Sequence, residues 1–123
     1  MVQSIPDDSE LRLKVVFFRS ERGSEPVREW LKSLAVDEKR IIGEDIKTVQ
    51  FGWPVGMPIV RKLEPGLWEV RSRLVHRIAR VLFTIQDDKM VLLHGFIKKS
   101  DKTPQDDLSL VRQRLAQLRG KNE

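Results

Sequence analysis

Charged side chains stand inside segments of the chain that otherwise look like half-buried β-strands. In the segment 67–74, Glu69, Arg71 and Arg73 fall on one face, because strand side chains alternate between two faces. The two following segments add three more cations: Arg80, Lys98 and Lys99. If these segments pair as a meander, several cations converge on one surface of a sheet.

Such a cluster costs free energy through like-charge repulsion unless acidic groups or a bound anion compensate it. Glu69 can compensate one arginine, and the sequence offers few other acidic partners nearby. One interpretation is that the missing counter-charge is a phosphate group. The other is an ion-pair ladder across the sheet, with acidic partners such as Glu44 or Asp45 arriving from the helices.

Most other kinds of catalytic chemistry lack the residues they need. The chain has no cysteine, which excludes disulfides, thiolate metal sites and thiol nucleophiles. Neither His76 nor His94 stands at helical spacing from a second metal ligand, and His94 fits a structural role. There is no glycine-rich phosphate loop and no serine nucleophile elbow. We therefore expect no metal and no cofactor.

The positive charge lies in the second half of the chain. The net charge is +5, yet residues 1–60 carry 9 basic and 10 acidic side chains, against 14 and 8 in residues 61–123. A localised basic field attracts polyanions, most often nucleic acid. The alternative is a solvated surface that acidic neighbours balance.

Length and hydropathy predict one small domain. The chain has 123 residues, which fits a single domain over 1–123, and residues 1–10 are expected to be mobile. No apolar run approaches the roughly 20 residues that span a bilayer, and the N-terminus lacks an apolar signal-peptide region. We therefore expect a soluble, cytoplasmic protein.

The elements before residue 59 are expected to be a strand and two helices. β-branched and aromatic residues predict a strand over 11–19. Ser24 as a cap and Pro26 in the first turn begin a helix. Its apolar face is Val27, Trp30, Leu31 and Leu34. A second helix begins at Asp37, carries Ile42, Ile46 and Val49 inward, and ends at residues 51–54.

Four strands and a last helix are expected after residue 58. The strands cover 59–63, 67–74, 77–86 and 90–98, although the join at 75–76 has no turn residues. Thr103 is a good cap for the last helix, Pro104 fits its first position and Asp106 completes a capping-box-like start. The apolar stripe of this helix is Leu108, Val111, Leu115 and Leu118. We predict an α+β domain in which an antiparallel sheet of four to five strands carries all three helices on one face.

Two motifs in this order and spacing resemble the phage-derived HigB-like toxins of the RelE/ParE superfamily. They are Gly-Leu-Trp-Glu-x-Arg at 66–71 and Gly-Phe-x-Lys-Lys-x-x-Lys-Thr-Pro at 95–104. Residues 26–31 and 80–83 add to the likeness, which spans about residues 12–119. The resemblance implies a compact RelE/ParE-like fold, cleavage of mRNA on the translating ribosome and a cognate antitoxin. The antitoxin expected in this branch is a HigA-like helix-turn-helix protein that represses its own operon.

The resemblance also implies roles for individual residues. Arg71, Arg80, Lys98 and Lys99 match the basic positions of the motif, and Glu69 matches its acidic position. Adjacent residues are assigned to RNA binding: Arg61, Lys62, Arg73, Arg77, Phe96 and Lys102. The chain departs from many RelE-type toxins because it has no tyrosine. Base stacking would therefore fall to Phe96, Trp68 or another ring.

The mechanism that fits these residues is a metal-independent cleavage in which the RNA's own 2′-hydroxyl attacks the neighbouring phosphate. Arg71 and Arg80 would stabilise the phosphorane, since a guanidinium offers two parallel donors to phosphate oxygens. Lys98 or Lys99 is a candidate base, and Glu69 either competes for that role or orients Arg71. Three alternatives remain open: a ParE-like inhibitor of DNA gyrase, a nucleic-acid-binding module without catalysis, and a degenerate toxin that only binds antitoxin.

Overall fold

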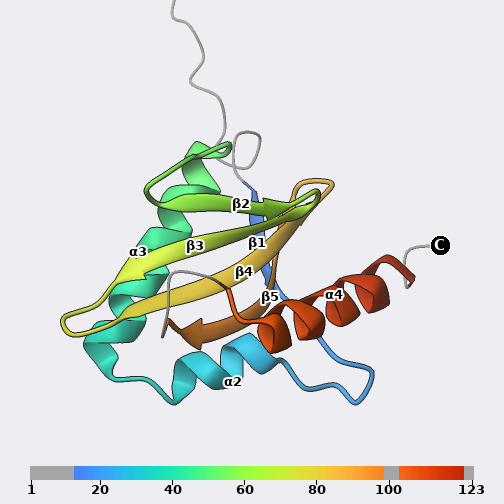
Figure 1. Ribbon diagram of the computed structural model, residues 1–123, viewed down its shortest axis with the longest axis horizontal. Coiled ribbons are helices and arrows are strands. Elements are labelled where there is room, and N and C mark those ends of the chain that lie inside the picture. The colour runs from blue at the N-terminus through green and yellow to red at the C-terminus, as the bar shows by residue number, and fades with distance from the viewer. Residues whose placement is uncertain (1–12, 99–102, 121–123) are drawn as a thin grey trace, which may run out of the picture.

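The computed structural model describes residues 13–98 and 103–120 of the chain (Figure 1). Residues 1–10, for which we predicted mobility, lie outside this range. The elements follow in the order β1 (Lys14–Phe17), α2 (Pro26–Lys32), α3 (Val36–Gly52), β2 (Val60–Glu64), β3 (Leu67–Arg73), β4 (Ile78–Gln86), β5 (Lys89–Ile97) and α4 (Gln105–Gly120). The predicted α+β class is confirmed, with every expected strand and helix present among the described residues.

The five strands form a single mixed sheet in the order β1-β5-β4-β3-β2. The predicted antiparallel meander is confirmed for β2 to β5. The expectation of a wholly antiparallel sheet is wrong, because β1 pairs in parallel with β5 in the register Lys14 to Lys89. A parallel pair needs a long connection between its strands, and here α2, α3 and β2–β4 all intervene.

The helices cover both faces of the sheet, so the prediction of three helices on one face is wrong. α2 and α3 pack on one face, where Val27, Ile42 and Val49 join Val70 and Phe83 in the larger core cluster. α4 packs on the opposite face, where its apolar residues lie against Leu67, Leu82 and Leu93. The strands carry apolar side chains on both faces of the sheet, so helices must bury each face separately.

The two helices between β1 and β2 form largely as their patterns predict. Pro26 occupies the first turn of α2, but the N-cap is Glu25 rather than Ser24, whose hydroxyl hydrogen-bonds that of Ser20 at 2.7 Å. In α3, Ile42, Ile46 and Val49 are buried as expected. α3 ends at Gly52 because Trp53 precedes a proline and adopts an extended ψ of 134°.

α2 lies unusually close to the edge of β5. A Cβ added to Gly95 would run into the indole ring of Trp30, so glycine is required for this approach. The Trp30 ring belongs to the larger core cluster, although the residue is only half buried. Gly95 therefore sets how closely the helix layer packs on the last strand.

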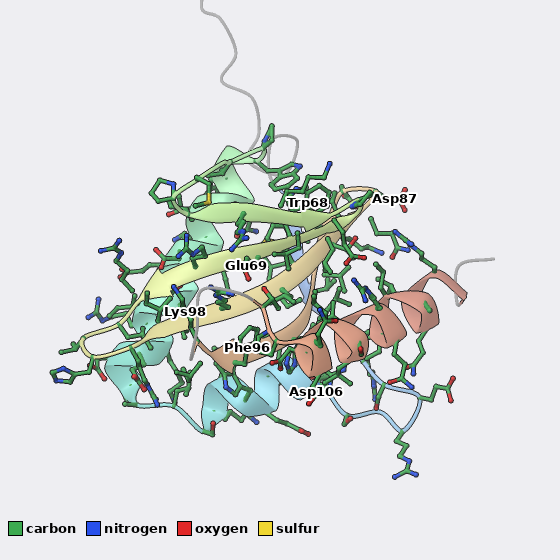
Figure 2. All side chains as sticks on the ribbon, in the orientation of Figure 1. Trp68, Glu69, Asp87, Phe96, Lys98 and Asp106 are labelled. Carbon is green, nitrogen blue, oxygen red and sulfur yellow. The ribbon has the colours of Figure 1, made fainter. Side chains whose placement is uncertain are left out.

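α4 divides its face of the sheet into an apolar half and a charged half. Val111 and Leu115 are buried, and Leu108 and Leu118 pack beside them, which confirms the predicted stripe. The helix begins at Gln105, and the amide of Leu108 donates to the carbonyl of Pro104. The part of the face that lies beyond the first turn of α4 carries the charged strand residues (Figure 2).

Candidate functional site

The register of β3, β4 and β5 brings the predicted cations onto one face of the sheet. Arg71 lies opposite Arg80, and Arg80 lies opposite Phe96 on the next strand. Glu69 precedes Arg71 by two residues and shares its face. Figure 2 shows Glu69 near the middle of this face, Phe96 and Lys98 nearer its edge, and Asp106 at the start of α4. We call Glu69, Arg71, Arg80 and Lys98 the basic face.

Arg80 and Glu69 form a buried ion pair at the centre of the basic face. Neither residue has exposed surface (0% each), and Arg80 Nη1 lies 3.6 Å from Glu69 Oε2. The Thr103 hydroxyl bridges them, because it accepts from Arg80 Nη1 at 3.2 Å and donates to Glu69 Oε2 at 3.4 Å. The predicted role of Thr103 as the cap of α4 stays a prediction. The two hydrogen bonds of Thr103 hold the segment just before α4 against the sheet.

Arg71 is a cation of this face that has no acidic partner among the described residues. Its predicted partner Glu69 is engaged by Arg80 instead. Among the residues that the structure describes, Arg71 makes no ion pair and its buried Nε has no hydrogen-bond partner. The side chain is half buried beside a hollow of about 40 Å³ that is lined by Pro58, Arg73 and Ile78. A half-buried guanidinium without a partner is suited to an anion with several oxygens.

Lys98 lies directly after β5 at the border of the basic face. Its backbone amide donates to the carbonyl of Ile78 at 2.7 Å, and this bond extends the β4–β5 pairing by one residue. The residue is half buried. Lys99 and Lys102, to which the motif gives related roles, lie outside the described residues.

The other predicted RNA-binding arginines and lysine are spread over the molecule. Arg61 lies opposite Glu69 and so shares its face, whereas Lys62 lies opposite Trp68 and takes the other face of the edge strand β2. Arg73 is exposed near the end of β3. Arg77 lies at the β3–β4 turn and donates two hydrogen bonds of 2.8 Å to Glu38 of α3. Their assignment to RNA binding stays a prediction.

The helix carboxylates suggested as partners in an ion-pair ladder, Glu44 and Asp45, belong to α3. Glu44 pairs with Arg40 on the same helix, at 3.3 Å, and α3 packs on the opposite face of the sheet. Glu38 of α3 pairs instead with Arg77 of the β3–β4 turn, and the hydrogen bonds from Arg77 are the main cause of its lowered pKa. That pair lies at the turn and leaves Arg71 unmatched.

Sequence reasoning missed a hydrogen-bonded triad beside the basic face. His94 Nε2 lies 2.6 Å from Asp107 Oδ1, and His94 Nδ1 lies 3.3 Å from Arg114 Nη1. Arg114 Nη1 also donates to the carbonyl of Leu93 at 2.7 Å. Because an arginine only donates, Nδ1 accepts and the Nε2–H donates to Asp107, which defines a neutral imidazole. The spacing of 13 and 20 residues between its members gives no local signal of this triad.

Both ring nitrogens of His94 are therefore engaged, in agreement with the structural role expected for it. Burial lowers the pKa of His94, and the nearby Arg114 acts in the same direction, while the Asp107 carboxylate opposes them. The ring also stacks on Phe96, with centroids 5.5 Å apart and planes at 24°. The triad thus holds the Phe96 side chain at the edge of the basic face.

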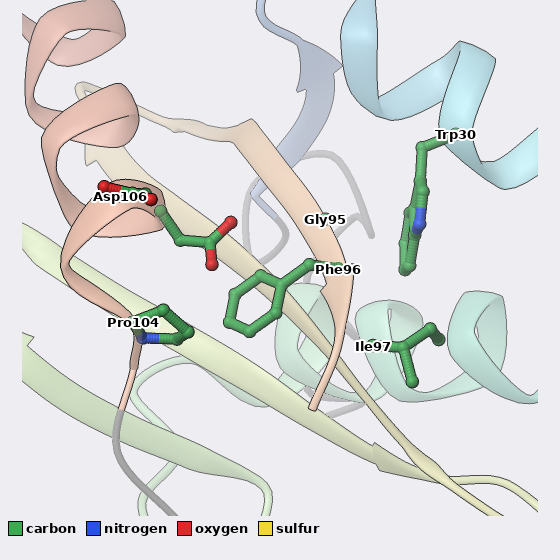
Figure 3. A pocket seen from close by; sticks show the side chains of 7 residues that line it. Trp30, Gly95, Phe96, Ile97, Pro104 and Asp106 are labelled. Atoms are coloured by element: carbon green, nitrogen blue, oxygen red, sulfur yellow. The ribbon is translucent and has the colours of Figure 1, made fainter. Parts of the chain in front are cut away.

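A pocket lies between the end of β5 and the start of α4 (Figure 3). Its lining residues are Trp30, Gly95, Phe96, Ile97, Pro104, Asp106 and Asp107, and its volume is about 540 Å³. We call it the β5–α4 pocket. It adjoins the basic face through Phe96, the cross-strand neighbour of Arg80.

Two further findings concern the described residues as a whole. Within 13–98 and 103–120, no group of three or more histidine or acidic side chains is arranged to hold a metal ion. None of the helices there is long and apolar enough to cross a membrane.

The fold and the site together define a class: a small α+β protein whose mixed sheet presents a cluster of arginines beside an aromatic ring. Residues 29–116 match the family described as phage derived protein Gp49-like (DUF891), and the chain belongs to this family. It is a family of RelE/HigB-type toxins from toxin–antitoxin systems, so membership implies an antitoxin as partner. No curated protein matches the chain.

Proposed function

We propose that this protein is a ribosome-dependent endoribonuclease that cuts translated mRNA at the basic face. The observation that carries the proposal is Arg71, a half-buried guanidinium that has no acidic partner among the described residues. Arg80 does not compete for the substrate, because Glu69 and Thr103 already hold it. An arginine of the sheet without an acidic partner among the described residues supports binding of a single phosphodiester.

The proposed reaction is an in-line transfer within the RNA. The 2′-hydroxyl oxygen forms a bond to the adjacent phosphorus, and the bond from phosphorus to the 5′-oxygen of the next nucleotide breaks. The hydroxyl proton goes to a base, and the leaving oxygen takes a proton from an acid. The products are a 2′,3′-cyclic phosphate and a 5′-hydroxyl, and no water or metal enters this step.

The geometry supports different roles for the residues of the basic face. Arg71 would bind the non-bridging phosphate oxygens, whose charge grows as the phosphorane forms. Arg80 and Glu69, both fully buried beside Arg71 on the same face, would position Arg71 rather than touch the RNA. Lys98 is then the described candidate for proton transfer, beside Lys99 of the same motif. With so few groups, the ribosome would have to supply much of the substrate's orientation.

The partners proposed for this activity are the translating ribosome with its mRNA and a HigA-like helix-turn-helix antitoxin. Both require a cytoplasmic location. The family supports an antitoxin in general, and the helix-turn-helix type follows from the sequence resemblance.

The test is to induce the protein in a bacterium and map new RNA 5′ ends across all transcripts. Arg71→Gln should lower the frequency of cuts by about 100-fold, in the range seen when one oxyanion donor is removed. Arg40→Gln is the matched control, because Arg40 is an exposed arginine on the far face of the sheet. Arg80→Ala is avoided, since it would leave Glu69 buried and unpaired.

The outcomes separate the competing functions. Cuts inside reading frames that vanish with Arg71→Gln and when translation is blocked would support the proposal. Undiminished cutting by Arg71→Gln would remove the role assigned to Arg71. Growth arrest and DNA damage without new RNA ends would point to gyrase as the target, and the proposal would be withdrawn.

A further inference from the structure

The β5–α4 pocket offers aromatic and acidic groups immediately beside the basic face. The Phe96 ring lies near Pro104 and the first turn of α4, while Trp30 lies beyond β5 (Figure 3). Phe96 is the cross-strand neighbour of Arg80, whose other neighbour is Arg71. A nucleotide whose phosphate lies on Arg71 therefore has its base within reach of this pocket.

Phe96 is held in a position that suits base stacking. One neighbour of its ring is His94, stacked at 5.5 Å between centroids and fixed in turn by Asp107 and Arg114. The residue is only half buried, so part of the ring faces the pocket. Stacking on an aromatic ring adds affinity for a base and tolerates every base, because each base has a π-face. Phe96 alone therefore gives affinity without selection.

The selective group is the carboxylate of Asp106. Asp107 is engaged by His94, but Asp106 is exposed and has neither an ion pair nor a side-chain hydrogen bond among the described residues. A carboxylate has two acceptor oxygens and no donor. Guanine is the base that presents two adjacent donors, N1–H and N2–H, on one edge. Adenine and cytosine offer one amino group there, and uracil offers a single N–H beside two carbonyl oxygens that a carboxylate repels.

We propose that Phe96 and Asp106 form a nucleobase site that selects guanine beside the cleaved phosphate. This inference rests on the proposed function, because it assigns the substrate preference of the same site. The Phe96 ring would stack the guanine, and the Asp106 carboxylate would accept from N1–H and N2–H as a bidentate pair.

An arginine from a protein partner is the other ligand that an aromatic ring and a carboxylate would suit. The surroundings favour RNA over such an arginine. Phe96 lies next to Arg80 and near Arg71, and a further cation there would be repelled. A nucleotide brings a phosphate that can pair with the Arg71 guanidinium and a neutral base that can donate to the Asp106 carboxylate. Both charged groups of the site would then have a partner.

The experiment uses synthetic messages translated in a cell extract with the full-length protein. Three messages differ at one nucleotide of one codon, which is guanine, inosine or adenine. Inosine keeps N1–H but lacks the amino group that carries N2–H. We expect cutting beside guanine to exceed cutting beside adenine by about tenfold, within the range of one bidentate base contact, with inosine in between.

The decisive comparison is the guanine-to-adenine ratio in Asp106→Asn and in a control variant. Asp106→Asn should bring the ratio close to one, because an amide offers one acceptor and places a donor against the base. The matched control is Asp37→Asn, which changes an exposed carboxylate in the first turn of α3 on the other face of the sheet. It should leave the ratio unchanged.

Each result bears on one of the two proposals. Cutting by the wild-type protein without a guanine preference, or a preference that Asp106→Asn retains, would overturn the guanine site and leave the ribonuclease standing. No cutting by the wild-type protein would overturn both. Loss of antitoxin binding in Asp106→Asn, with the base ratio unchanged, would assign the pocket to a protein partner and overturn the inference.

Discussion

At the scale of single residues, the charges of the basic face differ in what they can contribute. Arg80 and Glu69 are fully buried and face each other at 3.6 Å, so each compensates the charge of the other. Arg71, two residues from Glu69 on the same face, has no acidic partner among the described residues. The sequence placed all three residues on one face but could not say which arginine would take the carboxylate.

The buried pair leads to a prediction about stability. Glu69→Gln should lower the free energy of unfolding by about 3 kcal/mol or more, because it leaves the Arg80 guanidinium buried without a counter-charge. Urea denaturation measures the change. Glu64→Gln is the control, since it removes a partly exposed carboxylate that pairs with the exposed Arg112 at 2.8 Å, and it should cost much less. Equal losses in the two variants would contradict the argument.

If Glu69→Gln alone does not fold, a double variant can still test the argument. Glu69→Gln combined with Arg80→Met removes the stranded charge and should recover part of the lost stability. If the double variant is less stable than Glu69→Gln alone, the pair stabilises the fold by packing rather than by charge.

At the scale of elements, local patterns were sufficient for the helices and for the meander. Spacings of three and four residues predicted the buried faces of α3 and α4, and turn residues predicted the ends of β2 and β4. The parallel pairing of β1 with β5 was not predictable in this way, because it joins residues that are 75 apart in the chain, such as Lys14 and Lys89. The position of α4 on the second face likewise depends on which apolar strand residues the other helices leave uncovered.

The close contact between α2 and β5 gives the second stability prediction. Gly95→Ala should lower the free energy of unfolding by about 1–3 kcal/mol, because the new methyl group would have to displace the Trp30 ring. Gly43→Ala is the matched control. Nothing lies within 4 Å of a Cβ at Gly43, so alanine should stabilise α3 by about 0.5–1 kcal/mol.

Urea denaturation with tryptophan fluorescence measures both glycine variants and reports on the Trp30 environment. A shifted emission for Gly95→Ala, with no shift for Gly43→Ala, would locate the strain at α2. A neutral or stabilising Gly95→Ala would show that the helix can move away from the strand without loss.

At the scale of the whole molecule, side chains from the first turn and the middle of the C-terminal helix hold it on the sheet. Near its start, Asp107 holds His94, and further along Arg114 reaches the Leu93 carbonyl. On the edge of the sheet, Arg112 pairs with Glu64 at the end of β2. These contacts join residues that are 13 to 48 apart, and none has a sequence signature. These contacts fix the position of α4, and with it the part of this face of the sheet that the helix leaves uncovered.

The His94 triad makes the stability of the whole molecule depend on pH. Burial lowers the pKa of His94 below its ordinary value of 6.5, so between the two values the unfolded chain binds more protons than the folded one. Neutral His94 therefore makes its full contribution to the free energy of unfolding above pH 6.5. This contribution is lost as the pH falls through the lowered pKa of the folded state. Protonation also places a cation against Arg114 and breaks the hydrogen bond at Nδ1.

We expect the free energy of unfolding to fall as the pH drops below 6.5. In His94→Gln most of this dependence on pH should disappear, because glutamine does not titrate. His76→Gln, at the exposed β3–β4 turn, should keep the wild-type slope, and urea denaturation across this pH range distinguishes the two variants. An unchanged slope in His94→Gln would assign the pH dependence to the carboxylates instead. Because the same triad holds the Phe96 ring, the loss of stability on acidification should be accompanied by a loss of order at the edge of the basic face.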